Sequence, residues 1–187
     1  MKDPPTDPEL ARFLAGRQPF LEEELSWRNQ EIRLVLAAYL SPDLPPRRLV
    51  SSVRAIVLRA GEILVQRSVE DVHVLPGGRL ESGEGPEEGL HREILEETGW
   101  RVEVLTLLGF EYFHHLTPKP PGYAYPYPDF LWAIYLARAV EPAPEGRVED
   151  GYELGSDFRS IDEARTLGLT PVQLQYIEAA VAAERRA

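Results

Sequence analysis

The chain has 187 residues, of which 43% are hydrophobic, and this is enough for one domain with a real core. Its formal net charge of −11 disfavours broad nucleic-acid binding, because nucleic acid is itself a polyanion. Cysteine is absent, which excludes disulfides, zinc–thiolate sites and a catalytic thiol. The sequence shows no apolar run that could cross a bilayer and no secretory leader at Met1, so we expect a cytoplasmic protein without a membrane partner.

Residues 1–46 are interpreted as an N-terminal helical extension, and residues 47–187 as the main domain. Between Pro8 and Leu40 apolar residues recur at helical spacing, and the proline-rich run from residue 41 to 46 ends the pattern. A helical cap packed on the main domain is the favoured interpretation. An arm that forms a homodimer or binds another partner, and an arm that gates a substrate, stay open as alternatives.

From residue 50 the pattern is that of short strands. Val50–Leu58 alternates, and residues 59–62 turn the chain into a second strand at 63–67. Further extended segments are predicted at 72–75, 79–81, 101–115, 130–138 and 155–161. A turn of helix begins at Ile161, and Thr170 followed by Pro171 starts a helix that should run to about Glu184. Strands in runs, with helices between and after them, predict an α+β fold.

A further helix is predicted at about residues 86–98. Pro86 suits a first helical position, and Gly99 suits the position just past a helix end. The turn at Pro76–Gly78 precedes it, because glycine accepts the positive φ that such turns need. Gly89 inside the helix costs about 1 kcal/mol against alanine, so a loop or a ligand should approach closely there.

This helix carries Glu93, Glu96 and Glu97 at positions i, i+3 and i+4, which are neighbours on one arc. The three carboxylates repel each other unless something holds them together. A hard divalent cation with oxygen ligands is the obvious partner. Arg92 precedes Glu93 and lies four residues before Glu96, so it can hold the carboxylates in place.

The stretch from residue 78 to 100 reads Gly, five residues, Glu, seven residues, Arg-Glu, an apolar residue, any residue, Glu-Glu, any residue, Gly and an apolar residue. It resembles the signature of the Nudix hydrolase family with no position missing, a match with a chance probability of about one in a million. The matching positions are Gly78, Glu84, Arg92, Glu93, Ile94, Glu96, Glu97, Gly99 and Trp100. The alternative, a solvated acidic helix, leaves the glycines, the proline and the arginine unexplained.

The resemblance covers about residues 47–187 and implies an α/β/α sandwich with a mixed central sheet and a catalytic loop–helix–loop. It implies cleavage of a nucleoside diphosphate linked to another group, with Mg²⁺ or Mn²⁺. By position, Glu93, Glu96 and Glu97 resemble metal ligands together with the carbonyl oxygen of Gly78. Glu84 resembles a supporting carboxylate near a second metal or an ordered water, and Arg92 resembles the residue that orients Glu93. A nucleotide-binding sensor without catalysis is the alternative, but such a protein should have lost some of these glutamates.

Family members often use one more glutamate from a later loop as a base or ligand. The candidates here are Glu141, Glu145, Glu149 and Glu153, and the loop at 140–151 is rich in Pro, Gly and Glu. We favour Glu145 or Glu149, with a solvated loop as the alternative.

The substrate is less well marked. Residues 115–118 carry no subfamily marker for ADP-ribose or dinucleoside polyphosphates at its expected place. Tyr123, Tyr125 and Tyr127 could stack on a nucleobase, or could pack on their own domain. Arg54 and Arg67 could contact phosphate or ribose, or could be ordinary outward-facing charges.

Overall fold

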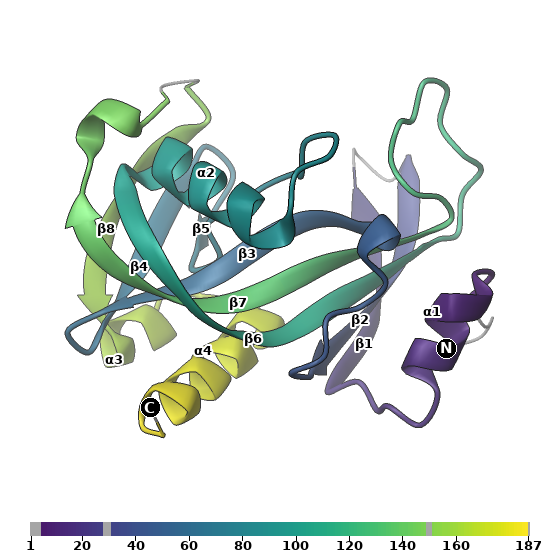
Figure 1. Cartoon of the computed structure of the whole chain (residues 1–187), viewed down its shortest axis with the longest axis horizontal. Helices are drawn as coiled ribbons and strands as arrows, with labels where there is room; N and C mark the ends of the chain where they lie inside the picture. Colours follow the sequence, from purple (N-terminus) through teal and green to yellow (C-terminus); the bar gives the residue numbers. More distant parts are fainter. Residues whose placement is uncertain (1–4, 28–30, 149–150, 187) are drawn as a thin grey trace.

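A computed structural model describes residues 5–27, 31–148 and 151–186 of the chain (Figure 1). The strands are β1 (Leu21–Trp27), β2 (Ile32–Leu40), β3 (Val50–Arg59), β4 (Glu62–Ser68), β5 (Val72–His73), β6 (Trp100–His115), β7 (Asp129–Pro142) and β8 (Glu153–Ser160). The helices are α1 (Pro8–Leu14), α2 (Pro86–Thr98), α3 (Ile161–Arg165) and α4 (Pro171–Glu184), with short 3₁₀ turns η1 (Arg47–Leu49) and η2 (Pro144–Gly146). Within the described residues the strands form one mixed sheet in the order β1-β2-β6-β7-β3-β4-β5, with β8 beside β4.

The two faces of the sheet are covered by different helices (Figure 1). On one face, Leu90 and Ile94 of α2 are fully buried against side chains of β3 and β7 such as Val57. On the other face, Tyr176 and Ile177 of α4 pack on the opposite side of the same strands. Because strand side chains alternate between faces, β3 and β7 are apolar on both sides. This arrangement confirms the predicted α+β fold with a mixed central sheet.

The sheet splits between β3 and β4, and this split positions the glycine turn. These strands pair only at Leu58–Ile63 and Arg59–Glu62. Further along β3, residues 76–80 take the neighbouring place: Val53 N donates to Gly78 O at 2.9 Å, and Leu80 N donates to Ser51 O at 3.1 Å. The backbone of the turn is therefore fixed against a central strand.

The helix predicted for residues 8–40 is wrong beyond Leu14. Residues 21–40 form the β1–β2 hairpin, and β2 pairs antiparallel with β6. The apolar residues that suggested a helix lie four apart, as Leu21 and Leu25 do, and a spacing of four also keeps residues on one face of a strand. Pairing with β6 then decides in favour of the strand. The division of the chain after residue 46 stays a prediction.

The other predicted elements agree well with the structure. α2 has the predicted bounds, and Gly99 caps it with a φ of 70°. α4 runs from Pro171 to Glu184 with Thr170 as its N-cap. The strand predicted at 79–81 is reduced to a single bridge between Ser52 and Arg79. Among the helices of the described chain, none has both the length and the apolar content to cross a membrane.

Candidate active site

The acidic motif (residues 78–100) is built around α2. Pro86 at its first position has no N–H that would need a partner. The N–H of Gly85 donates to the side chain of Glu88 at 3.2 Å, which caps the start of the helix. Leu90 and Ile94 face the sheet. The glutamates on the adjoining side of α2, Glu93 and Glu97, therefore lie beside the glycine turn at the split between β3 and β4. Gly89 allows the close approach that its position predicts, since a Cβ there would clash with Leu80 and with the carboxylate of Glu84.

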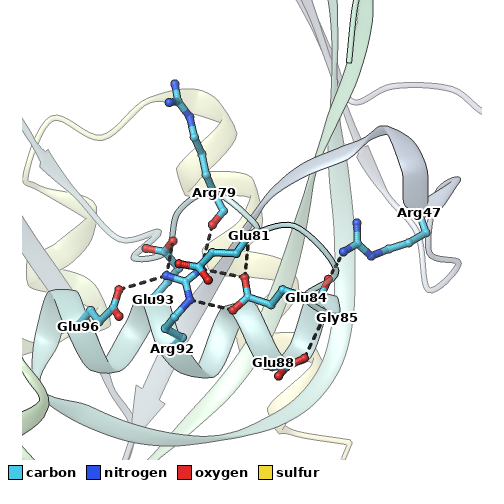
Figure 2. A network of polar contacts seen from close by, with 9 residues as sticks. All are labelled: Arg47, Arg79, Glu81, Glu84, Gly85, Glu88, Arg92, Glu93 and Glu96. Atoms are coloured by element: carbon cyan, nitrogen blue, oxygen red, sulfur yellow. Dashed lines mark hydrogen bonds and ion pairs between the residues drawn. The ribbon is translucent and has the colours of Figure 1, made fainter. Parts of the chain in front are cut away.

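Arg92 is the centre of the motif (Figure 2). Its Nε and Nη2 donate to the two carboxylate oxygens of Glu84, each at 2.8 Å. Its Nη1 donates to Glu93 Oε1 at 2.9 Å and to Glu96 Oε2 at 3.1 Å, and Nη2 also reaches the carbonyl of Arg79 at 3.0 Å. One guanidinium thus binds three carboxylates and the backbone of the glycine loop, a geometry that suits the planar fork of arginine.

The carboxylates differ in their electrostatic environment. Hydrogen bonding to Arg92 lowers the pKa of Glu84. Burial raises the pKa of Glu93, although Arg92 opposes the rise. Burial also raises the pKa of Glu97 to about 7, against the opposing hydrogen bond from Gly77 N to Glu97 Oε2 at 2.8 Å. Arg92 is one positive charge among Glu84, Glu93, Glu96 and the neighbouring Glu97, so the motif has an excess of acidic groups that a cation would neutralise.

This donor set fits a hard divalent cation, because every side-chain donor is a carboxylate oxygen. Among the described residues, however, no three acidic or histidine side chains converge on one point as a formed metal site. Glu96 is held by Arg92 and its side chain is 39% exposed, so it has room to turn. Binding of an ion therefore requires side-chain rotation within the motif.

Gly78 has two roles in this geometry. A Cβ at Gly78 would collide with the carboxylate of Glu93, so glycine lets that carboxylate lie against the backbone. Its carbonyl oxygen accepts from Val53 N at 2.9 Å and from Ser52 Oγ at 2.6 Å. Both lone pairs are thus engaged, and the predicted metal contact of this carbonyl requires Ser52 to release it.

A cavity of about 620 Å³ opens beside the motif, and Glu93, Glu96 and Glu97 line it. Arg54 lines it too, and His73 beside it has its pKa lowered to about 4 by burial and by the charge of Arg54. A second cavity of about 860 Å³ adjoins the first, since the two share the lining residues Trp27, Arg54, Glu70, Gly78 and Trp132. The acidic motif therefore lies at the side of a large depression with a cationic side chain in it.

The predicted substrate residues are divided between this depression and other places. Arg54 donates to Leu75 O at 3.0 Å and lies 4.6 Å from the ring centroid of Trp132. Arg67 instead faces Asp157 at 3.4 Å and lines a separate cavity of about 280 Å³.

The three predicted tyrosines also separate. Tyr123 and Tyr125 line the second cavity, and Tyr125 receives a hydrogen bond of 2.8 Å from Arg79. Tyr127 donates to Thr117 O at 3.0 Å and is not among the residues that line either cavity. Packing on its own loop, the alternative open from the sequence, therefore describes Tyr127 best.

The downstream glutamates lie in different surroundings. Glu153 lines the cavity of about 620 Å³ beside the acidic motif. Glu145 is exposed in η2, Glu141 lies 3.5 Å from Arg101, and Glu149 is outside the described residues. The assignment of a base to Glu145 or Glu149 stays a prediction.

Several lining residues were not identified from the sequence: Trp27, His73, Arg79, Glu111 and Trp132. Glu111 had one signal, since it is a single acidic residue between Phe110 and Tyr112 in an apolar run. Trp27 and Trp132 had no such signal, because their contact depends on pairing between strands that are distant in sequence.

The split mixed sheet and its polyacidic loop–helix–loop define a class of α+β protein with clustered carboxylates beside a cavity. A family model described as NUDIX domain matches residues 48–180. The chain therefore belongs to the Nudix family.

Relatives of similar sequence fit this assignment. A MutT-like protein of Streptomyces ambofaciens is 46% identical over 66 residues, which are 35% of this chain and 43% of that protein. The putative ADP-ribose pyrophosphatase YjhB of Bacillus subtilis is 33% identical over 104 residues, which are 55% of this chain and 46% of that protein. The chain thus matches less than half the length of these two relatives.

Solved structures share the fold. A NUDIX hydrolase from Nitrosomonas europaea superposes with a TM-score of 0.54 at 25% identity, over 72% of this chain and 90% of that one. The pyrophosphohydrolase BsRppH of Bacillus subtilis superposes with a TM-score of 0.58 at 19% identity, over 88% of this chain and 96% of that one.

Proposed function

We propose that the protein is a pyrophosphohydrolase, which cleaves the phosphoanhydride of a nucleoside diphosphate linked to another group, such as a modified nucleoside triphosphate or a nucleotide sugar. The observation that carries this proposal is that Glu93, Glu96 and Glu97 line the same cavity as Arg54. A bound diphosphate is stabilised by a cation and by a positive side chain, and the lining of this cavity supports both roles. A cytoplasmic location and a homodimer stay predictions.

Mg²⁺ or Mn²⁺ is the proposed cofactor. Glu93, Glu96, Glu97 and the carbonyl of Gly78 would hold it, with Glu84 as a supporting carboxylate near the site. When bound, such a cation supplies charge neutralisation at the diphosphate and a water of lowered pKa.

Two arginine side chains would position the carboxylates and the substrate. Arg92 fixes Glu84 and Glu93 through charge-assisted hydrogen bonds of 2.8 and 2.9 Å, so these carboxylates keep their place while the diphosphate binds. Arg54 has a free cationic edge beside the cavity and would bind a phosphate oxygen. Water then attacks phosphorus in line, and electrostatic stabilisation of the phosphoryl oxygens provides most of the catalysis.

The test is hydrolysis of a panel of nucleoside diphosphate derivatives with Mg²⁺ or Mn²⁺. Glu93→Gln should lower kcat by about two orders of magnitude or more, because it removes a charge at the reacting centre. Glu103→Gln is the matched control, since Glu103 is 57% exposed and pairs with Arg138 on the sheet edge. Full activity in Glu93→Gln would contradict the role of Glu93, and binding without cleavage across the panel would favour the sensor instead.

A further inference from the structure

Glu111 is a buried acidic residue that lines the cavity of about 620 Å³ beside the acidic motif. It lies on β6, opposite Ala38 of β2 and Trp132 of β7. It is only 5% exposed, and it is one of the residues that line the cavity. It stands apart from the acidic motif in sequence and is not part of the proposed metal site.

The carboxylate of Glu111 has no hydrogen-bond or ion-pair partner among the described residues. Arg54 contributes a favourable charge without forming an ion pair with it, and burial raises the pKa of Glu111 to about 7. A buried polar group without a partner is costly, and a structural core carboxylate is normally satisfied. The arrangement is explained if a ligand supplies the missing donors.

Two other polar groups that line the same cavity are also short of partners. Nε of Arg54 and Oε1 of Gln173 are buried and have no hydrogen bond within the part of the chain that the structure describes. An anion, a cation and an amide oxygen therefore border one cavity with hydrogen-bonding capacity unused. A ligand with both donors and acceptors would satisfy them.

An aromatic wall stands beside the carboxylate. Trp132 is the direct cross-strand neighbour of Glu111, so both side chains project from the same face of the sheet. Trp27 of the hairpin stacks on Trp132, with ring centroids 5.9 Å apart and planes at 16°. A flat ring fits this setting, with its face toward the indoles and its polar edge toward Glu111.

We infer that Glu111 is a specificity-determining residue that binds the adjacent N–H and NH₂ donors of a guanine-type base in the substrate. This inference rests on the proposed function, since it places the base of a nucleoside diphosphate in the cavity beside the acidic motif. A carboxylate accepts two parallel hydrogen bonds, and guanine offers its ring N–H and amino group side by side.

The neighbouring groups favour guanine over other bases. Among the common bases, guanine alone presents a ring N–H and an amino group side by side, and its carbonyl follows directly after these two donors. Adenine and cytosine present one amino group next to a ring nitrogen lone pair, which a carboxylate repels. Hypoxanthine keeps the carbonyl and the ring N–H but lacks the amino group. The difference in affinity between GMP and IMP therefore measures the hydrogen bond of the amino group alone.

The test is binding of nucleoside monophosphates at pH 8, above the raised pKa of Glu111. Binding is measured without metal, in EDTA, by calorimetry and by the fluorescence of the tryptophans. GMP should bind about tenfold or more tightly than IMP and AMP, because one hydrogen bond to a charged group contributes about 1.5–3 kcal/mol. Glu111→Gln should reduce this preference, because GMP donates two hydrogen bonds to the carboxylate and is weakened more than IMP, which donates one. Glu111→Asp, which keeps the charge on a shorter side chain, should retain part of it. Glu103→Gln should leave all affinities unchanged.

Other results would overturn the inference. Equal affinity for GMP and IMP in the natural protein would show that Glu111 does not read the amino group. A loss of affinity from GMP to dGMP, with no difference between GMP and IMP, would assign the carboxylate to a ribose hydroxyl instead. Failure of all monophosphates to bind would exclude a base site in this cavity. Hydrolysis of the panel without guanine preference would refute this inference alone, whereas guanine preference without hydrolysis would refute only the proposed activity.

Discussion

An unpaired carboxyl group in the core makes the stability of the protein depend on pH, and Glu111 gives a sharp prediction. Burial raises its pKa from an ordinary value of 4.5 to about 7. Between these two pH values the folded state keeps a proton that the unfolded chain has already lost. The free energy of unfolding therefore falls as the pH rises through this interval, and the loss is complete above the folded pKa. Each pH unit contributes about 1.4 kcal/mol, so the whole interval corresponds to about 3 kcal/mol.

Glu111→Gln removes the ionisable group while keeping the size of the side chain. We expect the variant and the natural protein to have similar stability near pH 4.5, where the buried carboxyl is protonated. At pH 8 the variant should be more stable by up to about 3 kcal/mol, less any cost of an unpaired amide. Arg54 and Tyr176 are the charged and titratable groups that interact electrostatically with Glu111, and burial moves the pKa of Tyr176 further above this pH range.

The assay is urea unfolding of both proteins at several pH values from 4.5 to 8, with Glu103→Gln as an exposed control on the same strand. Comparison with the natural protein at each pH cancels the contribution of Glu97, whose pKa is also raised to about 7. A difference in stability that does not change with pH would refute the reasoning, because it would mean that Glu111 titrates alike in the folded and unfolded states. Lower stability of Glu111→Gln at pH 8 would show that the carboxylate has a partner in solution.

Three further predictions concern the acidic motif. Arg92→Lys should lose about 1–3 kcal/mol of unfolding free energy in urea, because an ammonium cannot hold Glu84 with two parallel hydrogen bonds; unchanged stability would contradict the central role of Arg92. Gly89→Ala should destabilise the fold in the same assay although alanine favours helices by about 1 kcal/mol, since its Cβ would displace Leu80 and Glu84; a stability gain would show that this contact yields easily. Glu97→Gln should weaken Mn²⁺ binding measured by calorimetry about tenfold or more, and equal affinity would exclude Glu97 as a ligand.

Local signals in the sequence were enough to predict the acidic helix. Pro86 and Gly99 define its ends through backbone chemistry that needs no tertiary contact, and the observed bounds agree with them. The close approach at Gly89 was also predictable, because a glycine inside a helix has a cost that a neighbour must explain. The detail that Arg92 binds Glu84 eight residues earlier could be expected only in part, since the loop between them has no periodicity.

The N-terminal hairpin of β1 and β2 could not be predicted from local sequence patterns. Residues four apart share a face both in a helix and in a strand, so Leu21 and Leu25 could not distinguish the two. The partner strand β6 lies about 75 residues further along the chain, and only its pairing with β2 decides the structure. Glu111 was overlooked for the same reason, because its environment is made by three strands and a helix that are distant in sequence.

The hairpin and the acidic motif therefore supply different parts of one site. The motif lies inside the family match at 48–180 and carries the groups that suit diphosphate chemistry. β1 and β2 lie before that match, yet Leu25 and Trp27 line the cavity, and β2 pairs Ala38 with Glu111. The wall that would contact a base is thus partly built by chain outside the matched domain. Under the proposed function, substrate choice would vary separately from bond cleavage, because a change in the hairpin would alter the base wall without moving Arg92 or the carboxylates that it holds.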